Sequence, residues 1–225
     1  LDPRRVTKAH LDTRLNWRSL DLRSPENLAI FKIQSKLMTS MEEYLLNNKF
    51  MKVFTPSLIG GVSEGGSDVF PVVYFNKQVF LRQDPQLHRE LLIAGGFEKI
   101  FETGPSWRAE KSHTVWHMTE HRTIAAEIAF IEDEHDIMKV EENMVVYALE
   151  KIKKECGEQL EILDKEIKIP KTPFPELQFP KIYDILEELG TPVSKGEDLN
   201  REMEGTLGNY VKERSKSEFF FVNRF

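Results

Sequence analysis

Residues 98–130, EKIFETGPSWRAEKSHTVWHMTEHRTIAAEIAF, contain two runs with strand-like alternation on either side of a polar loop rich in His, Glu and Lys. Side chains in a strand alternate between two faces, so each run has one largely apolar face and one more polar face. Paired as an antiparallel hairpin, the runs place Arg108, Glu110, His121 and Glu127 around one side of a sheet. No tight-turn signal fixes the register, so this pairing is a prediction from the pattern alone.

The charged face of this hairpin has two interpretations. Buried charge is costly unless it is paired, so this face must meet water, a partner or a polar ligand. An Arg fixed on a strand can bind a phosphate or a carboxylate through two parallel hydrogen bonds, which makes Arg108 a candidate binding residue. The same spacing also fits a solvated outer face with ordinary ion pairs.

A resemblance to a known family favours the first interpretation. The segment 104–110, GPSWRAE, followed by His113, Thr114, His117 and Glu120, resembles motif 2 of class II aminoacyl-tRNA synthetases. The similarity is greatest to the aspartyl/asparaginyl subgroup in its archaeal and eukaryotic form. Four further segments resemble parts of this family in the same order along the chain. Residues 11–23 resemble the entry to the catalytic domain, and residues 54–56 the end of motif 1. Residues 63–67 resemble a loop beside the amino-acid pocket, and residues 83–87 a segment typical of the aspartyl branch.

The resemblance implies an α+β fold with a mainly antiparallel sheet flanked by helices, incomplete at the C-terminus. Residues 1–16 resemble the hinge that follows an anticodon-binding domain absent from this chain. Residues 17–225 resemble the N-terminal portion of the catalytic domain, with motifs 1 and 2. The glycine-rich motif 3 is absent, and the basic, polar start and aromatic end of the chain also suggest a fragment of a longer protein.

The activity implied is that of an aspartate–tRNA ligase, which activates aspartate with ATP and transfers it to tRNA. By matching positions, Arg108 binds the ATP α-phosphate and the amino-acid carboxylate, while Glu110, His117 and His121 contact ATP. The positions expected to bind the amino acid are Glu64, Gln86, Arg89 and Arg108. Pro56 is expected at the interface of a homodimer, although it can also simply terminate a strand.

Four positions depart from the family pattern, and one of them is His121, which stands where the family usually has a Phe stacked on adenine. Arg89 stands where the family has Lys, which keeps the charge but adds a planar fork. Ala125 stands where the family usually has an Asp that binds the substrate ammonium, and Trp116 replaces an Arg. These departures leave two alternatives open. One is a paralogue that activates another amino acid or asparagine, and the other is a non-catalytic dimeric relative that binds nucleotide or tRNA.

His113, His117 and His121 stand four residues apart, as three metal ligands on one helix face would. The segment reads better as a loop, so we predict no metal site in this chain. The family's catalytic Mg²⁺ ligands lie just before motif 3, and we therefore expect them outside this chain.

Composition excludes several classes of protein. With 225 residues, 40% of them hydrophobic, the chain can bury a substantial core, and a net charge of −6 disfavours a generally basic nucleic-acid-binding surface. A single cysteine fits a reducing compartment, and no apolar run approaches a membrane span, so we expect a cytoplasmic protein.

Periodicity and capping residues predict the remaining elements. We expect helices over 24–48, 86–94, 134–154 and 181–189, and strands over 50–54 and 219–222. A hairpin is expected over 69–82, turning at Asn76 and Lys77. Residues 165–180 are predicted to be a proline-rich connection, and those before Ser217 a polar segment.

Overall fold

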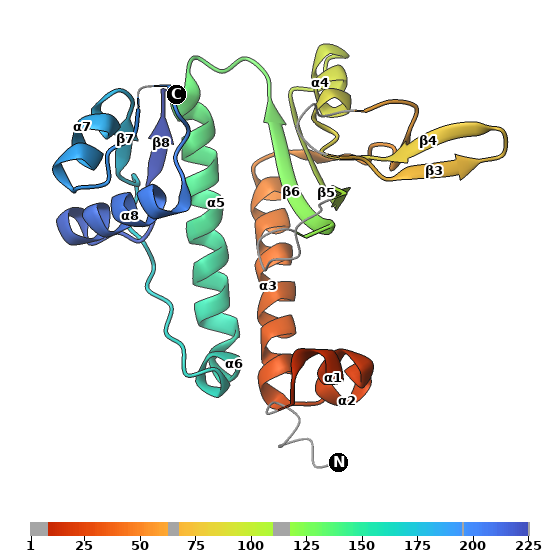
Figure 1. The fold of residues 1–225 in the computed structure, drawn as a ribbon, viewed down its shortest axis with the longest axis horizontal. Coiled ribbons are helices and arrows are strands. Elements are labelled where there is room, and N and C mark those ends of the chain that lie inside the picture. The colour runs from red at the N-terminus through yellow and green to blue at the C-terminus, as the bar shows by residue number, and fades with distance from the viewer. Residues whose placement is uncertain (1–8, 63–67, 110–117, 195, 225) are drawn as a thin grey trace. The chain divides into compact units, whose positions relative to one another are not determined.

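The computed structural model describes residues 9–62, 68–109, 118–194 and 196–224. By its internal contacts the chain divides into two compact units, one of Glu42–Asp133 and one of Leu1–Met41 together with Glu134–Phe225. Figure 1 shows the helices and strands of both units. Helix α3 (Pro25–Asn47) contributes residues to each unit.

The predicted hairpin forms the main sheet of the unit Glu42–Asp133. Strand β5 (Lys99–Trp107) pairs antiparallel with β6 (Glu120–Ile128), in a register that runs from Lys99 opposite Ile128 to Trp107 opposite Glu120. On its other edge β5 pairs parallel with the short β1 (Met51–Lys52). The strand predicted over 50–54 is therefore real but shorter.

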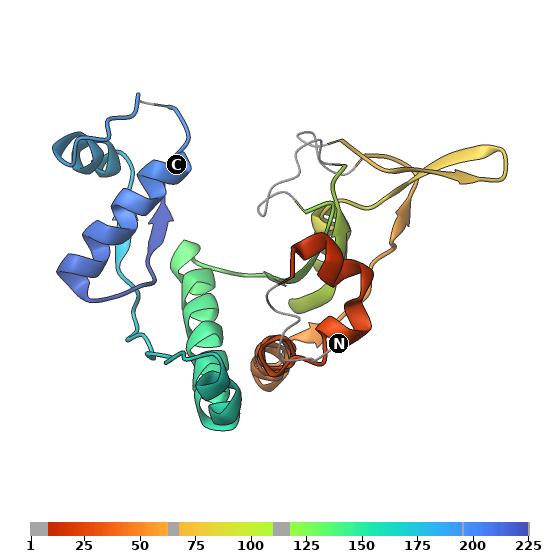
Figure 2. The same cartoon turned by 60° about the horizontal axis from the view of Figure 1, so that its bottom comes forward.

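A second sheet of this unit consists of β2 (Leu58–Ile59), β4 (Lys77–Leu81) and β3 (Pro71–Tyr74), in that order and antiparallel. Figure 2 shows β3 and β4 as a twisted two-stranded ribbon. Because Tyr74 pairs with Lys77, Lys77 already belongs to β4, and the turn falls on Phe75 and Asn76, one residue earlier than predicted.

Helix α4 (Gln86–Ala94) follows the second sheet and packs against the hairpin strands β5 and β6. Four apolar side chains of this unit are buried, two of them on β5: Leu45, Phe50, Ile100 and Phe101. The apolar half of the unit thus fixes the hairpin strands, which carry the polar residues of the candidate site.

The other unit begins with α1 (Leu11–Asn16) and α2 (Arg18–Asp21), two short helices in a region predicted to be partly linker. The buried Asp21 carboxylate accepts hydrogen bonds from Arg14 and Arg18. Ser24 caps α3 as predicted, since its hydroxyl accepts a hydrogen bond from the backbone N–H of Asn27 at 3.2 Å.

The long helix predicted after the hairpin is α5 (Glu134–Glu155), and it is followed by the short α6 (Gly157–Ile162). Lys36 of α3 forms an ion pair with Glu155 of α5 at 2.6 Å. Among the described residues, no helix is long and apolar enough to cross a membrane.

The C-terminal part of this unit contains two elements that the sequence did not predict. Strand β7 (Glu176–Gln178) lies in the proline-rich connection and pairs parallel with β8 (Phe221–Asn223). Helix α8 (Arg201–Ser215) occupies the segment that was predicted only to be polar. With α7 (Lys181–Glu188), it covers the strands over a small core: Phe179, Ile182, Leu186, Met203 and Leu207.

The aromatic end of the chain packs within this unit. Phe219 stacks on Phe174 with ring centroids 5.3 Å apart, and Phe221 contacts the same ring at 5.8 Å. The combination of antiparallel and parallel pairs with flanking helices confirms the predicted α+β class.

Candidate active site

The register of β5 and β6 gathers the polar residues on one face of the hairpin. Directly opposed residues of an antiparallel pair project to the same side. Glu102 faces Ala125, Gly104 faces Thr123, and Ser106 faces His121. Of the predicted charged face, Arg108, His121 and Glu127 therefore lie on one side of the hairpin, and Glu110 lies outside the described residues.

Arg108 lies one residue beyond β5, at the end of this face. Its backbone N–H donates to the carbonyl of Thr119 at 3.0 Å, and the next residue, Ala109, donates to the carbonyl of Asp68 at 2.9 Å. Arg108 itself is half-buried. The backbone that carries this guanidinium is thus held from two sides, which limits how far the group can move relative to the hairpin.

His121 lies on β6 and is half-buried beside the buried Ser106. Its position opposite the end of β5 puts it on the same face as Arg108. An imidazole here presents a flat, partly exposed ring, which is suited to stacking on a planar ligand.

Helix α4 brings two predicted residues to the unit. Gln86, the first residue of the helix, is exposed and donates to the Glu90 carboxylate at 2.9 Å. Arg89, one turn later, is buried and points to the hairpin, where it donates from Nε to Oε1 of Glu127 at 3.1 Å. The structure therefore connects Arg89 to the polar face and leaves Gln86 at the surface.

Arg89 has a second carboxylate partner, Asp84, in the turn that precedes α4. The terminal nitrogens NH1 and NH2 donate to Oδ1 at 3.2 Å, and NH2 donates to Oδ2 at 2.9 Å. Burial by itself lowers the pKa of the Arg89 guanidinium. The hydrogen bonds to Asp84 and Glu127 outweigh this effect and raise the pKa above its usual value. Arg89 is thus held as a cation between two anions.

Beneath the hairpin face lies a buried network that the sequence reasoning missed. NH1 of Arg82 donates to Oε1 of Glu102 at 2.7 Å and to the Thr55 hydroxyl at 2.7 Å. Nε of Arg82 donates to the carbonyl of Pro105 at 2.9 Å. The network joins β4, the connection after β1, and β5. The one available signal was an Arg directly after the apolar residues Val79, Phe80 and Leu81.

Some predicted residues cannot be placed. Glu64, Glu110 and His117, and also His113 and Trp116, lie outside the described residues. Pro56 is exposed in the connection between β1 and β2, four residues after the last pair of β1 with β5. Its predicted place at a dimer interface stays a prediction.

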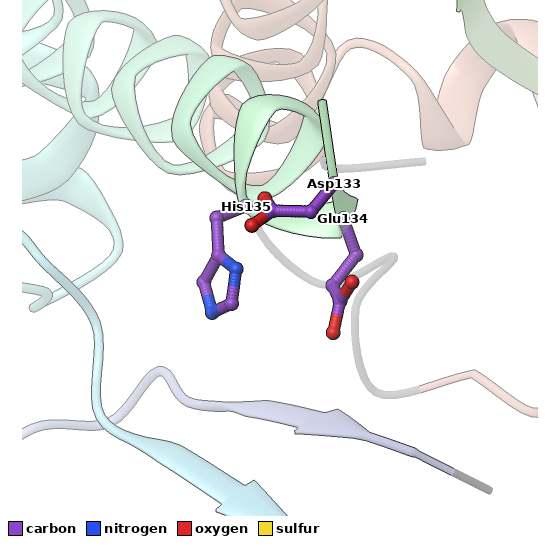
Figure 3. Close-up of side chains that lie close together, drawn as sticks. All are labelled: Asp133, Glu134 and His135. Carbon is purple, nitrogen blue, oxygen red and sulfur yellow. The ribbon is translucent and has the colours of Figure 1, made fainter. Parts of the chain in front are cut away.

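Figure 3 shows one group of possible metal ligands, Asp133, Glu134 and His135 at the start of α5. All three are exposed, and their ligand atoms lie within 4.8 Å of one another. Nε2 of His135 is 3.2 Å from Glu176, and Glu134 is 3.9 Å from Arg224. These contacts are those of a surface charge cluster, and we assign no metal to it.

Comparison with known proteins agrees with this geometry. The family model "tRNA synthetases class II (D, K and N)" matches residues 10–225. The aspartate–tRNA(Asp) ligase of Pyrococcus furiosus is 42% identical over all 225 residues, which cover 51% of that protein. The aspartate–tRNA(Asp/Asn) ligase of Methanopyrus kandleri is 42% identical over 95% of the chain and 49% of its own length. The chain thus spans about half the length of these relatives.

Solved structures give the same result for the fold. The asparaginyl-tRNA synthetase of Pyrococcus horikoshii, complexed with asparaginyl-adenylate, aligns with a TM-score of 0.84 and 34% identity over 96% of this chain and 49% of its own. The aspartyl-tRNA synthetase of Entamoeba histolytica aligns with a TM-score of 0.84 and 30% identity over 96% of this chain and 41% of its own.

Proposed function

Because this chain belongs to the class II aminoacyl-tRNA synthetases of the aspartyl, lysyl and asparaginyl group, we propose that the protein containing it is an aspartate–tRNA ligase. The reaction joins aspartate to ATP as aspartyl-adenylate with release of pyrophosphate, and then transfers the aspartyl group to the 3′ end of tRNA. Similarity to both aspartate–tRNA(Asp) and aspartate–tRNA(Asp/Asn) ligases supports aspartate as the amino acid.

The observation that carries this proposal is the position of Arg108. Adenylate formation brings an amino-acid carboxylate to a phosphate, so two anions must approach each other. A guanidinium on a restrained backbone offsets their repulsion and stabilises the charge of the transition state without having to reorganise. Arg108 meets this requirement, since hydrogen bonds of its own N–H and of its neighbour hold the chain at the end of the hairpin.

The remaining roles are those that the matching positions of the family imply. His121 stacks on the adenine, and Glu110 and His117 bind ATP from the loop between β5 and β6. Gln86, Arg89 and Glu64 bind the amino acid. Arg89 is the best supported of these, since it reaches the hairpin from α4 and contacts Glu127.

The family generally uses Mg²⁺ with ATP, and the described residues do not fit the role of its ligands. Magnesium prefers carboxylate oxygens and water. On the hairpin face, Glu102 is taken up by Arg82 and Thr55, and Glu127 and Asp84 by Arg89. We propose that the magnesium ligands lie outside this chain, as the resemblance to the family implies.

The proposal extends to partners and location. Aspartate and tRNA are the substrates, and Pro56 lies at the interface of a homodimer in the cytoplasm.

The alternatives are a paralogue that activates asparagine or another amino acid, and a non-catalytic dimer that binds nucleotide or tRNA. The reason to consider them is the methyl group of Ala125, which faces Glu102 where a carboxylate was expected.

The test is ATP–pyrophosphate exchange by the full-length protein with aspartate, with asparagine, and without amino acid. Exchange that depends on aspartate supports the ligase, and strict preference for another amino acid supports the paralogue. Absence of exchange from folded protein that still binds ATP contradicts the catalytic assignment. Loading of tRNA with labelled aspartate then checks the second step.

A further inference from the structure

The Asp84–Arg89–Glu127 cluster offers an inference about which side chain the pocket accepts. Arg89 is 4% exposed, while the side chains of Asp84 and Glu127 are 27% and 24% exposed. The guanidinium is therefore covered, and the two carboxylates that surround it reach the surface. A ligand arriving at this place meets a cluster of one positive and two negative charges.

Hydrogen bonding limits what Arg89 can still offer. A guanidinium carries five N–H groups and no acceptor. Four described hydrogen bonds run from Arg89, one to Glu127 and three to Asp84, and they engage all three nitrogens. Among the described residues, one N–H of Arg89, on NH1, has no acceptor, so Arg89 cannot bind a substrate carboxylate through two parallel hydrogen bonds as an unoccupied Arg does.

A carboxylate and an amide differ in how they suit this cluster. A carboxylate side chain would accept one hydrogen bond and would be repelled by Asp84 and Glu127, which lie on either side of the guanidinium. An amide side chain would accept the same bond through its oxygen. Its NH₂ group could donate to the partly exposed carboxylate oxygens, and it carries no charge to be repelled.

We propose that Asp84 is a specificity-determining residue that acts through Arg89 and reduces the preference of the pocket for aspartate over asparagine. This inference rests on the proposed function and concerns its amino-acid site. Asp84 does not touch the reacting atoms. It holds the Arg89 guanidinium in place and occupies N–H donors of Arg89 that would otherwise bind a substrate carboxylate. Asparagine therefore competes measurably with aspartate for this site.

The experiment uses the full-length protein and compares kcat/KM for aspartate and asparagine in pyrophosphate exchange. Asp84→Asn removes one negative charge with little change in size. We expect it to raise the aspartate-to-asparagine ratio roughly tenfold, the order expected when Arg89 donors released from Asp84 gain a charge-assisted hydrogen bond to the aspartate carboxylate. The KM for ATP should stay unchanged. Asp84→Glu, which keeps the charge, should leave the ratio near that of the unmodified protein.

Two comparisons separate this role from a merely structural one. Glu98→Gln removes an exposed carboxylate from the same unit and should not move the ratio. In an Arg89→Lys background, Asp84→Asn should shift the ratio by much less, because coupled residues give non-additive effects. An unchanged ratio in Asp84→Asn, or an equal shift with and without Arg89, overturns the proposal.

Calorimetric titration of the same proteins measures the binding of aspartate and of asparagine separately from exchange. It therefore separates a failure of the proposed ligase activity from a failure of the proposed role of Asp84. If exchange occurs but the ratio does not respond to Asp84→Asn, the ligase stands and the role of Asp84 falls. If no amino acid supports exchange but the binding ratio shifts as expected, the role of Asp84 stands and the ligase falls. If neither amino acid binds, both fall.

Discussion

Arg82 and Glu102 form a buried ion pair, with NH1 and Oε1 2.7 Å apart and side chains only 3% and 5% exposed. Glu102 also accepts the backbone N–H of Thr55 at 3.1 Å and its hydroxyl at 2.8 Å. The pair links β4 of one sheet to β5 of the other. It therefore fixes β5, the strand that precedes Arg108, relative to the segment that leads into α4.

Replacing Arg82 by Met should destabilise the protein by about 3–5 kcal/mol, because it leaves the Glu102 carboxylate buried without its cation. Equilibrium unfolding in urea measures this loss. The matched control is Arg122→Met, since Arg122 is 69% exposed and lies 3.8 Å from Glu120, where a pair contributes little. Equal losses in the two variants would contradict a structural role for the buried pair.

Gly104→Ala should destabilise the protein by about 1–3 kcal/mol, as overpacking does. A Cβ atom at this position would lie 2.3 Å from NH2 of Arg82. A long side chain could normally move aside, but the hydrogen bonds of Arg82 to Glu102, Thr55 and Pro105 hold its guanidinium in place. Urea unfolding again measures the effect. In an Arg82→Met background the penalty should largely disappear, and its persistence there would rule out this explanation.

The sequence predicted the β5–β6 hairpin well because alternation in a strand has a period of two, which assigns every residue of both runs to a face. It could not predict the cluster of Asp84 and Arg89. That contact depends on how the turn at Pro85 leads into α4 and on where Glu127 falls in the register, neither of which is set by local pattern. The sequence could thus name candidate binding residues, but it could not predict which residues they contact.

The missed helix α8 has a different reason. Its residues include Gly205 and Gly208 and several charged side chains, so its average composition is polar. Its buried residues are only Met203, Leu207 and Val211, spaced four apart. That narrow stripe is a helical signal, but it is weak beside the surrounding charges. Strand β7 is only three residues long and lies between prolines, where the sequence favours an irregular connection.

Acid should weaken the unit that contains Asp21. The hydrogen bond from Arg14 and the charge of both Arg14 and Arg18 hold the pKa of the Asp21 carboxyl below its usual value of 3.8, against the opposing effect of burial. A pKa that is lower in the folded state stabilises the fold at pH above the unfolded value. That contribution disappears as the pH falls from near 3.8 toward the folded pKa.

Asp21→Asn should accordingly be less stable than the unmodified protein at neutral pH and should lose less stability between about pH 5 and pH 3. Urea midpoints measured across this range provide the check. Asp12→Asn, at an exposed position on α1, should keep the pH dependence of the unmodified protein. The same slope in Asp21→Asn and the unmodified protein would show that another group causes the acid sensitivity.

Arg108→Ala in the full-length protein should abolish pyrophosphate exchange, with a loss of roughly 10³-fold or more, the size seen when a transition-state arginine is removed from phosphoryl transfer. Arg108→Lys keeps the charge but loses the planar fork, so it should recover only part of the activity. Arg122→Ala is the control, because Arg122 lies on β6 at an exposed position, opposite Pro105 and on the other face of the hairpin. Its exchange rate should be unchanged. Normal exchange in Arg108→Ala would remove Arg108 from catalysis and would favour the view that the hairpin's charged face is a solvated surface with ordinary ion pairs.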